Sequence, residues 1–276
     1  MSVVLFRRRG LGKGSCSGIV EYSESDIKVV RNDSPLPLDT SLIIRWGCTS
    51  RVPEGIPIMN KTEAIHRVAN KTGFRKLLME KAPVTIPNTI FRGDDYEENI
   101  KYVVRPATHS QGRHVYLATN PQEFNNAMLR CNLGWYASEY IPKVAEYRVC
   151  FVQGRVCWVA KKTPADPEAI AWNVALGGRF DNVRWNEWPL DVVSTAYEAF
   201  KLSGLDFSGI DVMVGPDGKC YILEANSAPS MTSNYRKKCI AKCIDWIVDT
   251  NMEHLLPDDN REGWRKWIHP ALLEQN

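Results

Sequence analysis

Short, contiguous apolar runs separated by turn residues characterise residues 1–58. The runs at 3–6, 27–30 and 42–44 predict buried strands, because their apolar residues are adjacent rather than spaced along one helix face. A glycine-rich loop from Gly10 to Ser15 is expected after the first run. This pattern is typical of a small α/β segment.

Beyond Pro57 the spacing of the apolar residues changes to that of amphipathic helices. The predicted helices cover residues 61–81, 121–131, 189–203 and 235–250. Two of these helices carry terminal signals. Asn120 stands at the N-cap position of the second helix, and Gly204 follows the third as a C-terminal glycine.

Strands fill most of the chain between these helices. They are predicted at residues 90–91, 102–117, 135–141, 147–160 and 210–223, several of them as hairpins. The polar stretch 163–189, which contains Gly177-Gly178, predicts a long functional loop. The tail beyond Leu255 carries Trp264 and Trp267 among charges, so we expect it to pack back onto the body.

The composition is that of an ordinary globular protein, with 44% hydrophobic and 24% charged residues in a chain of 276. A formal net charge of +3 is too balanced to indicate a nucleic-acid partner. The eight cysteines show no Cys-x-x-Cys pair and no zinc spacing, so we expect a reducing compartment. Without a signal peptide or a run of about 18 apolar residues, we expect a soluble, cytoplasmic protein with no membrane partner.

The hairpin over residues 209–226 carries the most informative polar residues of the chain. Glu224 and Asn226 are two positions apart on one strand and therefore share a face, and Asp211 lies on the partner strand. Three oxygen ligands at one end of a sheet suit a hard divalent cation such as Mg²⁺, with Mn²⁺ as an alternative. The flanking residues are so apolar that an unpaired Glu224 would be costly to bury, which argues against a plain surface hairpin.

A second group of candidates is basic. Arg105 follows a predicted strand, and Arg148 and Lys162 lie at opposite ends of the 147–162 hairpin. Strand alternation places either Lys161 or Lys162 on the same face as the acidic residues. Because phosphate oxygens need cationic donors, these residues together with a magnesium site predict a nucleoside triphosphate ligand.

Two loops give weaker signals. The segment 109–114, between two strands, could present backbone N–H groups to phosphates, although a plain turn explains it equally well. The loop after the first strand holds Lys13 and several glycines, and we expect Lys13 and Arg45 to bind an anionic acceptor such as a carboxylate. The alternative is an unstructured basic stretch; a phosphate-binding P-loop is disfavoured because the spacing Gly-x-x-x-x-Gly-Lys-Ser/Thr is absent.

The order of these pieces, from about residue 60 to residue 231, resembles the ATP-grasp superfamily of carboxylate–amine ligases. Within it the chain is most similar to the glutamate ligases that modify a ribosomal protein. The motifs that carry the resemblance are Asn70-Lys71, Val104-Arg105-Pro106, Ser138-Glu139-Tyr140-Ile141, Glu146-Tyr147-Arg148, Asn173 with Gly177-Gly178, and Glu224-Ala225-Asn226-Ser227-Ala228-Pro229.

The resemblance implies how the nucleotide is held. Lys71 and Arg105 would reach the α- and β-phosphates of ATP, and Gln111-Gly112 would close over them. The hinge segment Glu139-Tyr140-Ile141 would meet adenine, and Glu146 would bind the ribose hydroxyls. The family usually has lysine at the position of Arg105, so the phosphate contact there is expected to differ in detail.

The resemblance also implies the reacting end of the site. Asp211, Glu224 and Asn226 would hold magnesium, while Arg148, Lys162 and Asn173 would stabilise the transferring phosphoryl group and an acyl phosphate. None of the cysteines is required as a nucleophile. His114 stands where the family commonly has glycine, so a less mobile lid is expected.

These observations together predict an α+β protein with an ATP-grasp fold, in which two subdomains clamp ATP. The expected domains are an N-terminal α/β domain over residues 1–58, a central subdomain over 59–140 and a C-terminal subdomain over 141–276. The expected function is ATP-dependent ligation of a carboxylate to an amine or a thiol through an acyl phosphate. The acceptor would be an amino acid, a peptide or a protein terminus.

Two other functions remain open at this point. A kinase of the same fold would use the same magnesium site but leave phosphate on its acceptor. A catalytically inactive nucleotide-binding module would use ATP only to change shape. The intact set of Asp211, Glu224 and Asn226 argues against the inactive module.

Overall fold

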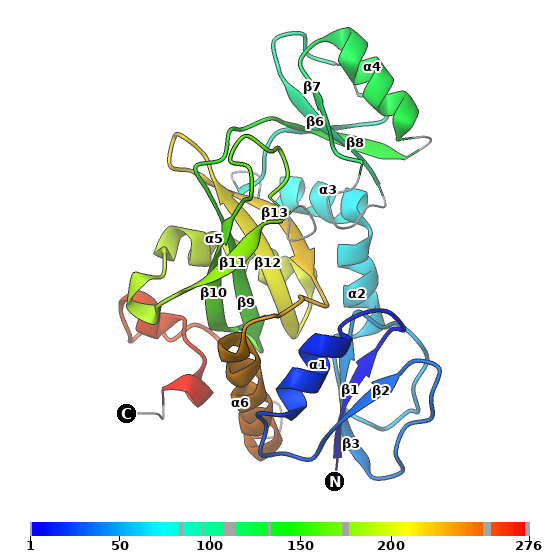
Figure 1. The fold of residues 1–276 in the computed structure, drawn as a ribbon, viewed down its shortest axis with the longest axis vertical. Helices are drawn as coiled ribbons and strands as arrows, with labels where there is room; N and C mark the ends of the chain where they lie inside the picture. The colour runs from blue at the N-terminus through cyan, green and yellow to red at the C-terminus, as the bar shows by residue number, and fades with distance from the viewer. Residues whose placement is uncertain are drawn as a thin grey trace.

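The computed structural model describes residues 2–82, 85–94, 96–107, 114–131, 134–172, 177–250 and 255–273. Its strands form three sheets that follow one another along the chain, with helices packed around them (Figure 1). The architecture is α+β, as predicted.

The first sheet contains the N-terminal strands in the order β2-β1-β3-β4. Strands β1 (Ser2–Arg7), β2 (Ile27–Arg31) and β3 (Thr40–Trp46) confirm the predicted runs, and the short β4 (Ile58–Met59) extends the sheet. All four strands are parallel, and every residue of β1 is buried. Burial of β1 on both faces explains why its apolar residues form a contiguous run.

The glycine-rich segment after β1 is partly helical, which the sequence analysis did not predict. Helix α1 (Lys13–Val20) begins after Gly12, whose φ of 66° lies in the left-handed region. A Cβ atom on Gly18 would lie 2.5 Å from the flexible end of the Lys237 side chain, so Gly18 faces helix α6 (Asn234–Thr250). Burial of Cys16 and Ile19 stabilises α1 despite its poor helix propensity.

The predicted helix over 61–81 is two helices, α2 (Thr62–Ala69) and α3 (Lys71–Lys81). They are separated at Asn70, whose side chain accepts a hydrogen bond from the Gly73 N–H and so caps α3. The expectation of one continuous helix was therefore wrong. The break places Lys71 at the first turn of α3.

The central sheet is antiparallel, in the order β5-β8-β6-β7. Its strands are β5 (Thr89–Phe91), β6 (Tyr102–Pro106), β7 (Tyr116–Ala118) and β8 (Trp135–Glu139). Helix α4 (Pro121–Arg130) covers it, and Asn120 caps this helix as predicted by accepting from the Glu123 N–H at 2.9 Å. Tyr102, Phe124 and Trp135 belong to a hydrophobic core that is separate from the cores of the other two sheets.

The third sheet is antiparallel, in the order β11-β10-β9-β12-β13. Its strands are β9 (Ala145–Val152), β10 (Arg155–Thr163), β11 (Arg179–Val183), β12 (Phe207–Val214) and β13 (Cys220–Asn226). The predicted loop 163–189 thus contains a strand, β11, and the short 3-10 helix η3 (Trp185–Glu187). Strand β11 was not predicted because most residues of this edge strand are polar.

Two helices cover opposite faces of the third sheet. Helix α5 (Leu190–Ser203) packs on one face, where Phe200 stacks on Phe151 with ring centroids 4.8 Å apart. Gly204 ends α5 with a φ of 68°, as predicted. Helix α6 packs against β10 on the other face and also contacts α1 (Figure 1). The part of this second face that α6 leaves uncovered carries the site described below.

The chain ends by packing back on the third sheet, as predicted. The tail contains the 3-10 helices η4 (Gly263–Lys266) and η5 (Pro270–Leu272), and Ile268 bridges to Val156 of β10. His269 is fully buried there, with its ring edge-on to Trp246. None of the helices in the described residues is long and apolar enough to cross a membrane. All eight cysteines are free thiols.

Asn60 joins the first and third sheets. Its backbone N–H donates to the Asp206 carboxylate at 2.7 Å, and its side-chain oxygen accepts from the N–H groups of Asp206 and Phe207 at 2.9 Å. Asn60 is fully buried and has a φ of 61°. The two sheets share one hydrophobic core, to which α2 and α3 also contribute.

Candidate functional site

The site is built on residues that lie abreast on neighbouring strands of the third sheet. Asp211 of β12 is opposite Arg148 of β9 on one side and opposite Glu224 of β13 on the other. Residues that pair across antiparallel strands share a face, so the fold brings these three side chains together. A β-bulge follows Asp211 in its pairing with β13.

A second row lies two residues further along the same face. Glu146 of β9 pairs with Lys162 of β10. Lys162 is buried, whereas its neighbour Lys161 is exposed. The structure therefore resolves the ambiguity left by strand alternation and places Lys162, rather than Lys161, on the face that carries Asp211.

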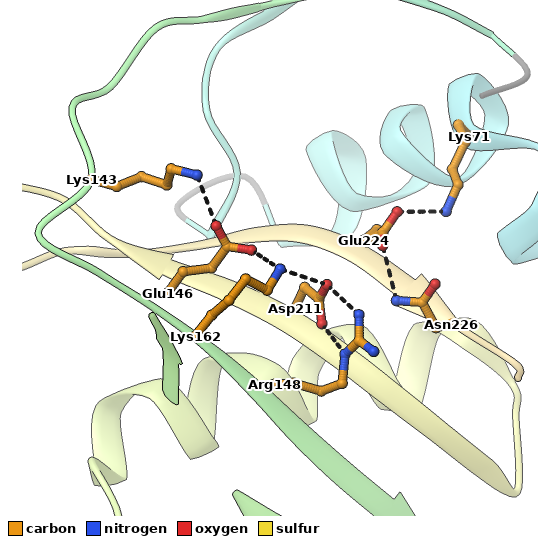
Figure 2. Close-up of polar contacts among 8 residues, drawn as sticks. All are labelled: Lys71, Lys143, Glu146, Arg148, Lys162, Asp211, Glu224 and Asn226. Carbon is orange, nitrogen blue, oxygen red and sulfur yellow. Dashed lines mark hydrogen bonds and ion pairs between the residues drawn. The ribbon is translucent and has the colours of Figure 1, made fainter. Parts of the chain in front are cut away.

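Ion pairs connect the two rows into a continuous chain of alternating charge (Figure 2). The Arg148 guanidinium donates to both oxygens of Asp211, at 2.5 and 2.7 Å. Lys162 is 3.6 Å from Asp211 and forms a short ion pair with Glu146. The other oxygen of Glu146 accepts from Lys143 at 2.8 Å. Each of these side chains is no more than 11% exposed.

A separate ion pair holds Glu224. Its Oε2 atom accepts from Lys71 at 3.1 Å, and its Oε1 atom accepts from the Asn226 amide at 3.0 Å (Figure 2). Burial acts to raise the pKa of Glu224, but the Lys71 and Arg148 cations and the Asn226 hydrogen bond outweigh it and hold the pKa well below its usual range. Glu224 is therefore a carboxylate at neutral pH.

The neighbouring cations keep their charge for the same reason. Burial acts to lower the pKa of Arg148, but its contacts with Asp211 raise that pKa above the ordinary value. Burial likewise acts to lower the pKa of Lys162, and the Asp211 and Glu146 carboxylates more than offset it. Strong fixed charges of both signs thus line one face of the sheet.

Phe180 of β11 supports these cations. Its ring centroid is 4.8 Å from the Arg148 guanidinium carbon and 5.2 Å from the Lys162 amine. Arg236 of α6 lies 5.5 Å from the same ring. Cation–π attraction to one aromatic ring helps to hold like charges close together. The sequence analysis missed Phe180 because it lies in the stretch expected to be a loop.

The charged face forms one wall of a cleft of about 610 Å³, and the central sheet and the 139–141 segment line it from the other side. Glu139, Tyr140 and Ile141 all border this cleft. The N–H groups of Glu139 and Tyr140 are bound by the carbonyls of Asn88 and Lys101, both at 2.7 Å. The fold thereby fixes the segment that we predict to meet adenine.

Two further predicted phosphate ligands come from the central part of the chain. Arg105, at the end of β6, borders the cleft, and Lys71 forms an ion pair with Glu224, which also borders it. The sequence analysis missed Arg75, which also borders the cleft. Its guanidinium donates to the Leu223 carbonyl at 3.0 Å and lies 5.2 Å from the Tyr136 ring centroid. Burial holds the pKa of Arg75 below its ordinary value.

Two residues with predicted binding roles make close contacts within the protein. Both oxygens of Glu146 are bound by lysines, and the buried side chain borders the cleft, so a ribose hydroxyl would have to share these oxygens with the lysines. Arg45 is also buried, and its guanidinium donates to the carbonyls of Cys48 and Ser50. These contacts favour a structural role for Arg45 rather than acceptor binding.

The remaining predictions concern loops. Lys13 is exposed at the first turn of α1, and Leu11 just before it borders the cleft, so an ordered turn and helix replace the unstructured stretch considered as the alternative. Gln111, Gly112 and Asn173 lie outside the described residues. His114 adopts a φ of 59°, a conformation that glycine adopts more readily.

The donor set at the reacting end fits a hard cation. Asp211, Glu224 and Asn226 supply carboxylate and amide oxygens, which are the ligands that Mg²⁺ prefers. In the described part of the chain, no cluster of three or more histidine, cysteine, aspartate or glutamate residues is arranged to hold a metal. Arg148 and Lys71 donate to the carboxylates of Asp211 and Glu224, so a metal bound there would share these carboxylates with the two cations or replace them.

Solved structures of similar fold include ATP-grasp ligases. The ligase PsnB in complex with minimal precursor, Mg and ADP is 14% identical, covering 90% of this chain and 97% of that chain, with a TM-score of 0.64. The D-alanine–D-alanine ligase from Bacillus anthracis in complex with ATP is also 14% identical, covering 91% and 97%, with a TM-score of 0.63.

A third structure contains a peptide. It is the RiPP-associated ATP-grasp ligase of Chryseobacterium gregarium in complex with ADP and a leader and core peptide, 15% identical, covering 91% and 97%, with a TM-score of 0.61. No curated protein sequence matches the chain. The model of the RimK-like ATP-grasp domain matches residues 63–247. The predicted ATP-grasp fold is thus confirmed, and the chain belongs to the RimK-like ATP-grasp family.

Proposed function

We propose that this protein is an ATP- and magnesium-dependent ligase that joins a carboxylate to an amine or a thiol through an acyl phosphate. One observation carries the proposal. Oxygen ligands suited to magnesium and cations suited to phosphate lie interleaved on one face of a sheet, inside a cleft bordered by a hinge segment. Family membership and the nucleotide complexes of similar structures support it.

The proposed reaction has two steps. A carboxylate oxygen of the first substrate attacks the γ-phosphorus of ATP, the bond from that phosphorus to the β,γ-bridging oxygen breaks, and ADP leaves. The nitrogen or sulfur of the second substrate then attacks the acyl carbon, the bond to the phosphate oxygen breaks, and phosphate leaves while the nucleophile loses its proton. No residue of the chain needs to be modified covalently.

The chain's own residues contribute charge and position. Arg148 and Lys162 keep their positive charges in a buried environment, so they can stabilise the negative charge of the transferring phosphoryl group. Asp211, Glu224 and Asn226 would hold magnesium, which supplies further neutralisation of phosphate charge when it is bound. The 139–141 segment would position the adenine, and Arg105 and Lys71 would contact the phosphates.

The acceptor is proposed to be an amino acid, a peptide or a protein terminus. Two of the similar structures contain a peptide or precursor as well as a nucleotide. In this chain the loop after β1, with Leu11 at the cleft and Lys13 exposed beside it, is the side from which an acceptor would enter.

The deciding experiment is a screen of amino acids and peptides for stimulated release of ADP and free phosphate, followed by mass spectrometry of the products. A ligase releases both and forms a condensed product. A phosphorylated acceptor without free phosphate would show a kinase instead, and nucleotide binding without turnover of any acceptor would indicate a binding module. Glu224→Gln serves as the inactive control.

A further inference from the structure

Lys143 is a cation in the cleft to which neither the sequence analysis nor the family resemblance gives a role. It lies two residues after Ile141, in the segment that connects β8 to β9. Its side chain is only 11% exposed and borders the cleft. Figure 2 shows its amine directed toward Glu146, at the opposite end of the ion-pair chain from Arg148.

Lys143 shares its counter-ion with a second lysine. Its amine lies 2.8 Å from one oxygen of Glu146, and the other oxygen of Glu146 is taken by Lys162. Two ammonium groups therefore face one carboxylate. Asp211, the next carboxylate along, is already bound through both oxygens by Arg148. The connected ion pairs thus contain three cations, Lys143, Lys162 and Arg148, and only two carboxylates, Glu146 and Asp211.

The pKa of Lys143 agrees with this excess of cations. Burial lowers the pKa of Lys143 below its ordinary value, Glu146 opposes the shift, and the nearby Lys162 and Arg105 cations add to it. A ligand anion placed among Lys143, Lys162 and Arg105 would relieve their mutual repulsion. An ammonium group has three N–H donors, so Lys143 can keep its contact with Glu146 and still bind a second acceptor.

Trp172 lies next to the Lys143 amine. Its ring centroid is 4.7 Å from the Lys143 amine, which fixes the amine by a cation–π contact. The tryptophan is only 8% exposed and borders the cleft, and its buried indole N–H has no hydrogen-bond partner among the described residues. A buried donor without a partner is costly, so a ligand rich in acceptor oxygens fits this end of the cleft.

We propose that Lys143 is a further nucleotide-binding residue, which contacts the phosphate nearest the ribose. This inference rests on the proposed function, because it assumes that adenine lies at the 139–141 segment and the γ-phosphate near Arg148 and Asp211. Lys143 follows the 139–141 segment in the chain, and Glu146 and Lys162 connect its amine to Asp211. The first phosphate of the nucleotide is the anion that this position would meet.

The test compares Lys143→Met with the wild-type protein in direct binding of adenosine, AMP and ADP, measured by calorimetry. Methionine keeps much of the side-chain length but removes the charge. A lost charge-assisted contact corresponds to about tenfold or more in affinity. We expect that loss for AMP and ADP alike and no change for adenosine, which has no phosphate.

Two companion variants complete the design. Lys161→Met makes the same substitution at an exposed lysine beside Lys162 and should bind all three ligands like the wild type. Lys143→Arg keeps the positive charge and should recover most of the affinity for ADP. Thermal unfolding without ligand shows whether each variant is folded, and Lys143→Arg tests the inference even if Lys143→Met is unstable.

The outcomes separate this inference from the proposed function. Normal ADP binding by a folded Lys143→Met variant overturns the inference and leaves the proposed function standing. An equal loss for adenosine and ADP also overturns it, because Lys143 would then act only by positioning Glu146 or the hinge. A wild-type protein that binds no ADP would overturn the proposed function as well.

Discussion

Arg148 and Asp211 lie directly opposite each other on neighbouring strands, and the guanidinium of one donates to both carboxylate oxygens of the other. An arginine thus binds both oxygens of the carboxylate that we propose as a magnesium ligand. Lys71 does the same for Glu224. Binding of Mg²⁺ and ATP would exchange these partners, with carboxylates turning to the metal and cations to the phosphates.

The first prediction separates the two acidic residues. Asp211→Asn and Glu224→Gln should both abolish ATP turnover, because each removes a charged oxygen from the proposed metal site. Only Asp211→Asn should also destabilise the free protein strongly, by about 3–5 kcal/mol, because it leaves the buried Arg148 without a counter-ion. Glu224 has a side chain 32% exposed, so its loss should matter less to unfolding.

Denaturant unfolding and ADP release measured on the same samples check this first prediction. Wild-type turnover by both variants in magnesium buffer would show that the metal site is elsewhere.

The second prediction concerns Lys162. Lys162→Met should lower kcat by about 100-fold or more while changing the affinity for ATP much less, because its charge is needed most as negative charge moves onto the transferring group. Lys161→Met is the matched control and should behave like the wild type, since its side chain is exposed. Equal losses in kcat and ATP affinity would make Lys162 an ordinary nucleotide-binding residue.

The third prediction distinguishes two basic residues of the N-terminal part. Arg45→Ala should lower the free energy of unfolding by about 2–3 kcal/mol, because it removes two hydrogen bonds from a buried guanidinium. Lys13→Ala should leave stability unchanged and raise KM for the acceptor about two- to fivefold. A change in KM for ATP alone would place Lys13 at the nucleotide.

The fourth prediction concerns pH. Burial, together with the nearby Arg155 cation, lowers the pKa of His269 to about 3, whereas an unfolded histidine titrates near 6.5. Because only the unfolded state binds this proton, stability falls as pH drops below 6.5. The expected loss at pH 5 is about 2 kcal/mol.

His269→Gln supplies the control for this effect. Glutamine does not titrate, so the stability of the variant should be nearly constant between pH 6.5 and pH 5, a range in which most carboxylates remain ionised. Urea unfolding at both pH values measures the difference. A slope as steep in the variant as in the wild type would assign the effect to another group.

Most strands and several polar site residues could be predicted from the sequence, because they depend on the local pattern of apolar and polar residues. The apolar runs of β1 and β3 and the caps Asn120 and Gly204 are local features, and the structure confirms them. Helix α1 depends on distant contacts, since it packs on α6 and its Ser15 hydroxyl accepts from the Met231 N–H at 2.9 Å. No local propensity reports such a contact.

The site residues also divide into those that a local pattern indicates and those that depend on distant contacts. Strand alternation limited the choice to Lys161 or Lys162, but only the pairing of Lys162 with Glu146 across two strands decides it. Lys143 lies in an irregular segment without a periodic pattern, so nothing in its neighbours indicated that it faces the cleft. The ion pair between Arg148 and Asp211 joins strands that are far apart in the chain and was not predicted either.

The separate core of the central sheet also has a consequence for how the molecule opens. The first and third sheets share one core and are tied through Asn60, whereas β5 to β8 and α4 pack mainly among themselves. Units with their own small core can unfold while the rest stays native, so amide hydrogens of β6 and β8 should exchange faster than those of β9 and β12. Strand β8 leads directly into the 139–141 segment. Binding of ADP should therefore slow amide hydrogen exchange most in β5 to β8 and α4. Nucleotide binding would then be coupled to the part of the fold whose amides are least protected.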